Sequence, residues 1–191
     1  SRRPSIAIAQ AELTLDAFLR LPERKPALQF EDGEVRQKVS PKGTHSVLQT
    51  ELVELFDQFA RPRKLARAFS ELRSTFGGRS YVPDVSVYRW DRIPVDDLGQ
   101  VANDFRTPPD IAIEIVSPQQ SVNAFVRRCI RYIELGAHVA LLVDPADESV
   151  LAFRSGHTPQ PLRGADRIDL DDVLPGFQLR VQELFNALRM P

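Results

Sequence analysis

Length, composition and charge place the chain among ordinary globular proteins and exclude several classes. Its 191 residues fit one domain with a full-sized core, and the net charge of −1 excludes a polycation that binds nucleic acid over its whole surface. The single cysteine, Cys129, excludes an internal disulfide and fits a reducing compartment. No apolar run is long enough to span a bilayer and the amino terminus is not signal-like, so we expect a cytoplasmic protein.

The amino-terminal region predicts a short helix followed by a β-hairpin. Thr14 can accept a hydrogen bond from the first turn of a helix over residues 14–19. Residues 28–30 and 35–39 have the pattern of two strands, and the Asp32-Gly33 pair between them is a strong hairpin signal. We therefore expect an amino-terminal hairpin ahead of the main sheet.

A longer helix with a basic carboxyl end is expected next. Thr44 can cap a helix that runs to about Phe59, because apolar residues recur along it at helical spacing. Arg61-Pro62-Arg63-Lys64 ends this helix, and Arg67 and Arg73 follow closely in the sequence. The basic cluster is interpreted first as a solvated loop, with contact to nucleic-acid phosphates as the alternative.

Two predicted strands, residues 82–88 and 111–117, each carry one carboxylate among β-branched residues. Asp84 lies in the first strand. In the second strand the three isoleucines share one face, which puts Glu114 on the other face. A lone acid on a half-buried strand is costly to desolvate unless it is paired or binds a metal. The two acids therefore predict one shared site.

The carboxyl-terminal half predicts further helices and strands. Ser117 and Gln120 have the spacing of a capping box for a helix that ends at Gly136. Residues 139–143 form an apolar strand typical of a sheet centre, and residues 150–153 are its expected partner. The apolar stripe expected on the helix comprises Val122, Phe125, Val126, Cys129, Ile130 and Ile133.

Two remaining regions complete the expected fold. Residues 90–109 are polar and without clear period, which predicts either a lid or a long surface excursion. Another strand pair is expected near Pro175-Gly176, before a closing helix from about Val181. No internal repeat or second domain is visible, so residues 1–191 are expected to form a single domain.

The predicted site combines carboxylate oxygens with a nearby cation. Asp84 and Glu114 supply ligands of the kind that Mg²⁺ or Mn²⁺ prefers. Such an ion can polarise a phosphodiester and activate a water molecule, and a positive side chain near the developing charge completes this chemistry. A strand with acid-x-cation spacing would place that charge at position 116, which is Val. The following helix offers Arg128, one turn before Tyr132.

Six short motifs, in the same order, resemble the Uma-two family of restriction endonuclease-like proteins in the PD-(D/E)xK nuclease superfamily. The resemblance covers nearly the whole chain. Its motifs are Phe30-Glu31-Asp32-Gly33-Glu34, Val39-Ser40-Pro41 with His45, Pro83-Asp84, Glu114-Ile115-Val116-Ser117-Pro118, Gly136 with Val143-Asp144-Pro145, and Leu174-Pro175-Gly176-Phe177.

The resemblance implies a restriction endonuclease-like α/β fold, a mixed β-sheet flanked by α-helices, and metal-dependent cleavage of DNA phosphodiester bonds. By match, Asp84 and Glu114 are the metal-binding acids, with Mg²⁺ or Mn²⁺ as the cofactor. Family members often carry a catalytic lysine where this chain has Arg128. Arginine keeps the charge and can hold a phosphate, but it does not readily act as a base. The implied partner is DNA, without a membrane, and a homodimer is left open.

Structural roles are the alternatives for each of these residues. Asp84 can be a turn residue that caps a strand, and Glu114 can form a partly buried ion pair with an arginine such as Arg128. Arg128 can also lie on a solvated helix face. A catalytically silent nucleic-acid-binding or interaction module on the same fold is therefore the alternative function.

Two further residues are reserve candidates for the site. Glu71, on a strand expected over residues 68–75, can supply an additional metal or water contact. Lys38 can supply a cation if the hairpin folds back over the sheet. For Glu71 we favour an exposed strand residue or an ion-pair partner over a metal ligand, and for Lys38 we favour a role outside the site.

Overall fold

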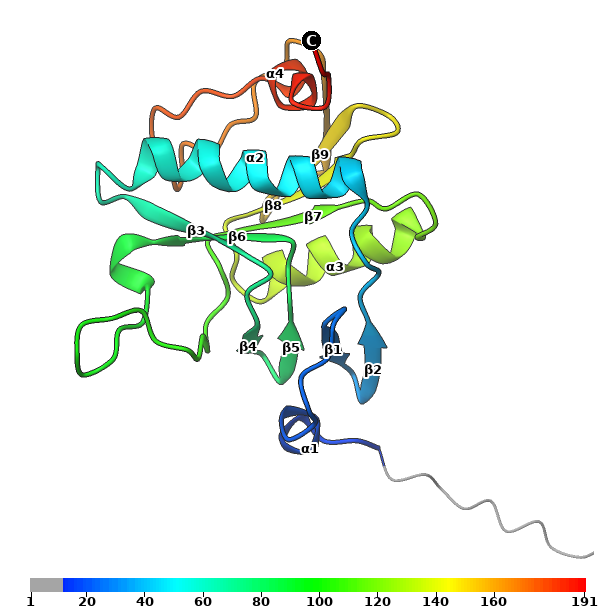
Figure 1. Cartoon of the computed structure of the whole chain (residues 1–191), viewed down its shortest axis with the longest axis vertical. Helices are drawn as coiled ribbons and strands as arrows, with labels where there is room; N and C mark the ends of the chain where they lie inside the picture. Colours follow the sequence, from blue (N-terminus) through cyan, green and yellow to red (C-terminus); the bar gives the residue numbers. More distant parts are fainter. Residues whose placement is uncertain (1–11) are drawn as a thin grey trace, which may run out of the picture.

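The computed structural model describes residues 12–191, which form two β-sheets with helices packed on them (Figure 1). The larger sheet is mixed, because β7 and β8 run parallel while its other neighbouring strands are antiparallel. Its spatial order is β10 (Gln160–Arg163), β9 (Ser149–Phe153), β8 (Val139–Asp144), β7 (Ile111–Ile115), β6 (Val85–Arg89) and β3 (Ala66–Ser70). The expected α/β fold, a mixed β-sheet flanked by α-helices, is confirmed.

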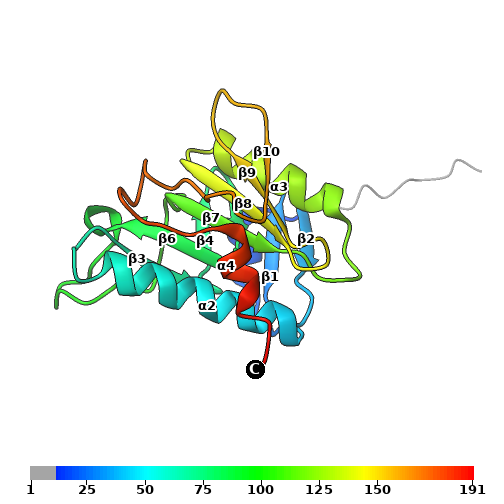
Figure 2. The ribbon, with the colours of Figure 1, turned by 90° about the horizontal axis from the view of Figure 1, so that it is seen from above.

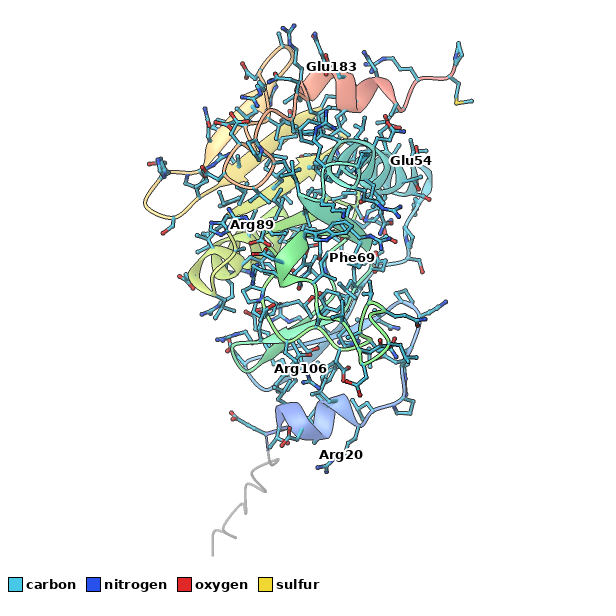
Figure 3. The ribbon with its side chains drawn as sticks, turned by 90° about the vertical axis from the view of Figure 1, so that its left-hand side faces the viewer. Arg20, Glu54, Phe69, Arg89, Arg106 and Glu183 are labelled. Atoms are coloured by element: carbon cyan, nitrogen blue, oxygen red, sulfur yellow. The ribbon has the colours of Figure 1, made fainter. Side chains whose placement is uncertain are left out.

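Helices cover both faces of the larger sheet, as Figures 1 and 2 show from two directions. Helix α2 (Gly43–Ala60) packs Leu48, Leu52 and Phe56 against the face that carries the three isoleucines of β7. Helix α4 (Val181–Asn186) joins the same core beside α2. Helix α3 (Val122–Glu134) covers the opposite face, the one that carries Glu114. Figure 3 shows side chains filling the space between these layers, with Glu54 on the exposed side of α2.

The smaller sheet lies beside the larger one, with the short helix α1 (Leu15–Leu19) beyond it (Figure 1). Its spatial order is β2 (Glu34–Gln37), β1 (Leu28–Glu31), β5 (Arg79–Tyr81) and β4 (Ser74–Phe76). The β1–β2 hairpin is confirmed, with Asp32 and Gly33 at positive φ in its turn. Strand β1 of the hairpin pairs with β5, and β5 leads directly into β6. The hairpin therefore lies close to Asp84, which directly precedes β6.

Other local predictions are also confirmed. The Thr14 hydroxyl accepts a hydrogen bond of 3.1 Å from Ala17 N, as expected of an N-cap. Strand β8 lies in the middle of the larger sheet, and Gly136 follows α3 at a φ of 115°. Residues 93–110 form an excursion with only isolated bridges, and the 3-10 helix Trp90–Arg92 precedes it.

Several expected boundaries in the first half of the chain were wrong. The strand predicted over residues 68–75 is two strands, β3 and β4, because Glu71 adopts a φ of 50° that ends the first. The strand predicted over residues 82–88 begins at Val85, so Asp84 precedes β6. Helix α2 begins at Gly43 and Lys42 is its N-cap residue, which places Thr44 inside the helix.

The second half also required corrections. Helix α3 begins at Val122, because Gln120 N donates to Ser117 O in a turn instead of opening the helix. Val122 and Ile130 are 45% and 41% exposed, and Tyr132 is buried in their place. Around Pro175-Gly176 the described chain has only the isolated bridge between residues 167 and 180, not a strand pair.

Candidate active site

Asp84 and Glu114 lie opposite each other at one end of the larger sheet. Strands β6 and β7 pair antiparallel with Val85 opposite Ile113. Extending this register by one residue places Asp84 opposite Glu114, and directly opposed residues project to the same face. Both side chains are buried and line a single cavity of about 200 Å³. The structure therefore brings together the two acids that the sequence selected.

Three groups hold the Asp84 carboxylate. Ile115 N donates a hydrogen bond of 2.7 Å to Oδ2, and His45 Nε2 lies 3.2 Å from the same oxygen. Lys38 Nζ donates to Oδ1 at 2.7 Å. Burial alone would raise the pKa of Asp84, but the His45 hydrogen bond and the Lys38 charge outweigh it and hold that pKa well below its usual range. Asp84 is therefore ionised at neutral pH.

Glu114 is less well compensated than Asp84. Its Oε1 accepts a hydrogen bond of 2.6 Å from the Tyr132 hydroxyl and lies 3.7 Å from an Arg128 guanidinium nitrogen. Its Oε2 is buried and has no hydrogen-bond partner. Burial raises the pKa of Glu114 to about 7, and the Asp84 charge adds to this effect. An unpartnered buried carboxylate oxygen is costly, which marks it as a place for a cation or a proton.

Arg128 reaches the cavity from α3. Its side chain is only 16% exposed, so the solvated helix face considered for it does not describe its position. The distance of 3.7 Å to Glu114 is an ion-pair contact but is longer than a hydrogen bond. Arg128 Nε is buried without a partner. Its guanidinium therefore has donors left for an anion in the cavity.

Of the reserve residues, Lys38 lines the cavity and contacts Asp84, contrary to the role that we favoured for it, whereas Glu71 is an ion-pair partner, which is a role that we favoured for it. Lys38 Nζ donates to Val82 O at 2.8 Å and to the Glu71 carboxylate at 3.0 and 3.1 Å, besides its contact with Asp84. Gln49 Nε2 donates to Glu71 Oε1 and to Asp84 O. The hairpin lies in the smaller sheet beside the larger one, and from there Lys38 reaches Asp84.

His45 and Gln49 were not assigned to the site by the sequence analysis. Both lie on the first turns of α2, four residues apart, and therefore on one side of that helix. His45 was read only as part of a family motif. The spacing of two polar residues next to the apolar stripe was the available signal, but it does not reveal which strand they contact.

The basic loop after α2 lies away from the acids. His45 contacts Asp84 near the start of α2, and Arg61 follows the end of the helix. At 1.5 Å per residue these positions are separated by about 24 Å along the helix axis. Arg63 donates to Phe59 O and lies over the Phe59 ring at 4.2 Å. Any phosphate bound by this loop would be distant from the cavity.

The donor set fits a divalent cation of the magnesium type. Mg²⁺ is commonly bound through one or two carboxylates, with waters and substrate phosphates as its other ligands. The ionised Asp84 and the unpartnered Glu114 Oε2 supply that pair on one cavity wall. Within residues 12–191 there is no cluster of three or more His, Cys, Asp or Glu side chains able to hold a metal. The two acids would therefore need water or substrate oxygens to complete the shell.

The fold and this pair of acids define the class of nuclease-like α/β proteins, and comparison with known proteins agrees. A solved structure described as a "putative nuclease belonging to DUF820", from Anabaena variabilis ATCC 29413, is 36% identical to the chain. It aligns with a TM-score of 0.89 over 92% of this chain and 99% of its own. A cryo-EM structure of a DrdV–DNA complex aligns at 13% identity and a TM-score of 0.39, over 75% of this chain and 12% of its own.

The chain belongs to the Uma2 family, whose description is "Putative restriction endonuclease" and whose model matches residues 15–182. This confirms the family resemblance drawn from the six motifs. The search of curated proteins found no match. None of the helices in the described range combines the length and apolar composition required to cross a membrane.

Proposed function

We propose that this protein is a divalent-metal-dependent endonuclease that hydrolyses DNA phosphodiester bonds, with residues 1–191 acting as one nuclease domain. The observation that carries the proposal is the buried, unpartnered Oε2 of Glu114 on the cavity that Asp84 also lines. Membership in a restriction endonuclease family supports DNA as the substrate.

In this proposal each acid is oriented by its neighbours to bind Mg²⁺ or Mn²⁺. Tyr132 holds Glu114 Oε1, which leaves Oε2 for the cation. Burial raises the pKa of the Tyr132 phenol well above its ordinary value, so it stays a hydrogen-bond donor. Ile115 N and His45 hold Asp84 Oδ2, and Oδ1, which Lys38 Nζ contacts at 2.7 Å, is the oxygen that would bind the cation. The bound ion would supply Lewis-acid polarisation of the phosphate and an acidified water molecule.

Arg128 is the candidate for stabilising charge on the phosphate. Its guanidinium lines the cavity next to Glu114 and retains unused donors. Burial acts to lower the pKa of Arg128, but the charges of Glu114 and Glu31 act against it, and the net effect is a raised pKa. Arg128 therefore stays protonated and cannot serve as the base, so its role in the proposal is electrostatic.

Cleavage of supercoiled plasmid, with Mg²⁺, with Mn²⁺ and with a chelator, tests the proposed function. We expect nicking that requires the divalent ion. Arg128→Ala should reduce the cleavage rate by about 10²-fold, because it removes one positive donor from the developing charge. Arg128→Lys should retain more activity than Arg128→Ala. A cleavage rate of Arg128→Lys well above that of the wild type would identify position 128 as a decayed catalytic position. Equal cleavage rates in all three proteins would rule out a role for Arg128.

One observation favours a second candidate, a catalytically silent nucleic-acid-binding module. Asp84 already has Lys38, His45 and Ile115 N as partners, so its charge is compensated without a metal. Such a module would shift DNA in a gel without divalent ions and would be insensitive to Asp84→Ala. Its affinity would instead fall when Arg61, Arg63 and Lys64 are neutralised, with a weaker dependence on salt.

A further inference from the structure

The geometry points to Lys38 as a positioning residue that sets the divalent-cation affinity of the site by competing for Asp84 Oδ1. This inference rests on the metal site of the proposed function and assigns a role to a residue outside the acid pair. In the structure the Lys38 ammonium holds Asp84. A divalent cation on that carboxylate would require the ammonium to move away.

The Lys38 ammonium lies in a shell of oxygen atoms. Its Nζ is 2.7 Å from Asp84 Oδ1, 2.8 Å from Val82 O, and 3.0 and 3.1 Å from the two Glu71 oxygens. An ammonium group has three protons, so four oxygens exceed what it can satisfy with linear hydrogen bonds. Anionic and carbonyl oxygens in this number are also the ligands that hard divalent cations prefer.

Electrostatics makes the two cations mutually exclusive. The Lys38 side chain is only 10% exposed. Lys38 Nζ lies within hydrogen-bond distance of the Asp84 and Glu71 carboxylates, and a lysine ammonium is charged near neutral pH. A divalent ion held by the same carboxylate would repel it at short range in a poorly solvated cavity.

The hairpin gives Lys38 a route out of the site. Lys38 directly follows β2, which is the edge strand of the smaller sheet and pairs only with β1. All four residues of β2 are exposed, and Lys38 N donates a hydrogen bond to Ala27 O. Moving this edge would therefore uncover little core. Glu71 follows β3 and Asp84 precedes β6, so the two carboxylate partners of Lys38 are on separate elements.

Calorimetric titration of the full chain with Mn²⁺ tests the competition. We expect Lys38→Met to bind Mn²⁺ about tenfold more tightly than the wild type, because the competing ion pair is gone. Lys38→Arg, which keeps the charge, should stay near the wild type. Lys42→Met is the matched control, since Lys42 is exposed and lies four residues further along, and its affinity should be unchanged. The rise in Tm on adding Mn²⁺ should be larger for Lys38→Met than for the wild type.

Asp84→Asn separates failure of this inference from failure of the proposed function. If Asp84→Asn abolishes Mn²⁺ binding while Lys38→Met binds no more tightly than the wild type, the metal site stands and the competition is overturned. If Mn²⁺ binds to none of the five proteins, both ideas are overturned. If Mn²⁺ binds only to Lys38→Met, the result supports both the metal site and the competition by Lys38.

Hydrogen exchange on the wild type gives a readout that does not require Lys38→Met to fold. Addition of Mn²⁺ should speed amide exchange over residues 34–39, because the ion releases Lys38 from Asp84. The rate over β10, at the far edge of the larger sheet, should not change. Unchanged exchange over residues 34–39 at saturating Mn²⁺ would overturn the competition.

Discussion

Replacing Asp84 by Asn should reduce metal-dependent plasmid cleavage by at least about 10³-fold, because the ionised ligand of the proposed cation is lost. Asn has the same shape but keeps one carbonyl oxygen, so either Ile115 N or Lys38 can still donate to it while the other donor loses its acceptor. Cleavage rates should be measured per folded molecule, with folding followed by circular dichroism. The loss should persist at saturating Mn²⁺.

Asp110→Asn is the matched control for this substitution. Asp110 is also fully buried and also forms a close ion pair, 2.7 Å from Arg92. It directly precedes β7 and lies about 13 Å along the strand from Glu114. Both variants lose a buried charge and should unfold more easily, but Asp110→Asn should cleave at the wild-type rate. Equal losses of cleavage in the two variants would show that Asp84 affects cleavage only by stabilising the fold.

Replacing Glu114 by Gln should lower cleavage by about 10³-fold while making the fold more stable at pH 8. The amide is isosteric and can still accept the Tyr132 hydrogen bond, but it does not bring a buried negative charge. Opposite changes in activity and stability are characteristic of a residue retained for function. If Glu114→Gln lowers both cleavage and stability, Glu114 instead supports the fold through its contact with Arg128.

The stability effect of Glu114→Gln should depend on pH in a defined direction. Burial raises the pKa of Glu114 in the folded state to about 7, above its ordinary value of 4.5. The fold therefore prefers the protonated acid, and this stabilisation is full below about pH 4.5 and is lost as pH rises toward 7. Between pH 5 and pH 8 the wild type should lose about 2 kcal/mol of unfolding free energy relative to Glu114→Gln. Urea unfolding of both proteins at the two pH values measures this difference.

Local patterns in the sequence were sufficient to find the acid pair. The alternation of β7 fixed which face carries Glu114, because side chains on a strand alternate between two environments. The Asp32-Gly33 pair located the hairpin for a similarly local reason, since its turn needs residues that tolerate positive φ. These signals depend only on neighbours along the chain.

The remaining parts of the site depend on how the elements pack. Lys38 contacts Asp84 across 46 residues of sequence, and that contact exists because the smaller sheet folds beside the larger one. Glu71 reaches Lys38 because a residue at positive φ ends β3, where sequence alternation indicated a continuous strand. The face of α3 was also misjudged at Ile130, since the stripe was read wider than the area that the sheet covers.

A crystal of the protein grown or soaked with Mn²⁺, with the ion located by its anomalous scattering, tests the shared acid site most directly. We predict one Mn²⁺ peak within about 2.3 Å of oxygens from both Asp84 and Glu114, with Lys38 Nζ displaced from Asp84. A peak bound to neither acid, or no peak in the cavity at saturating Mn²⁺ with the Lys38–Asp84 pair intact, would contradict the account.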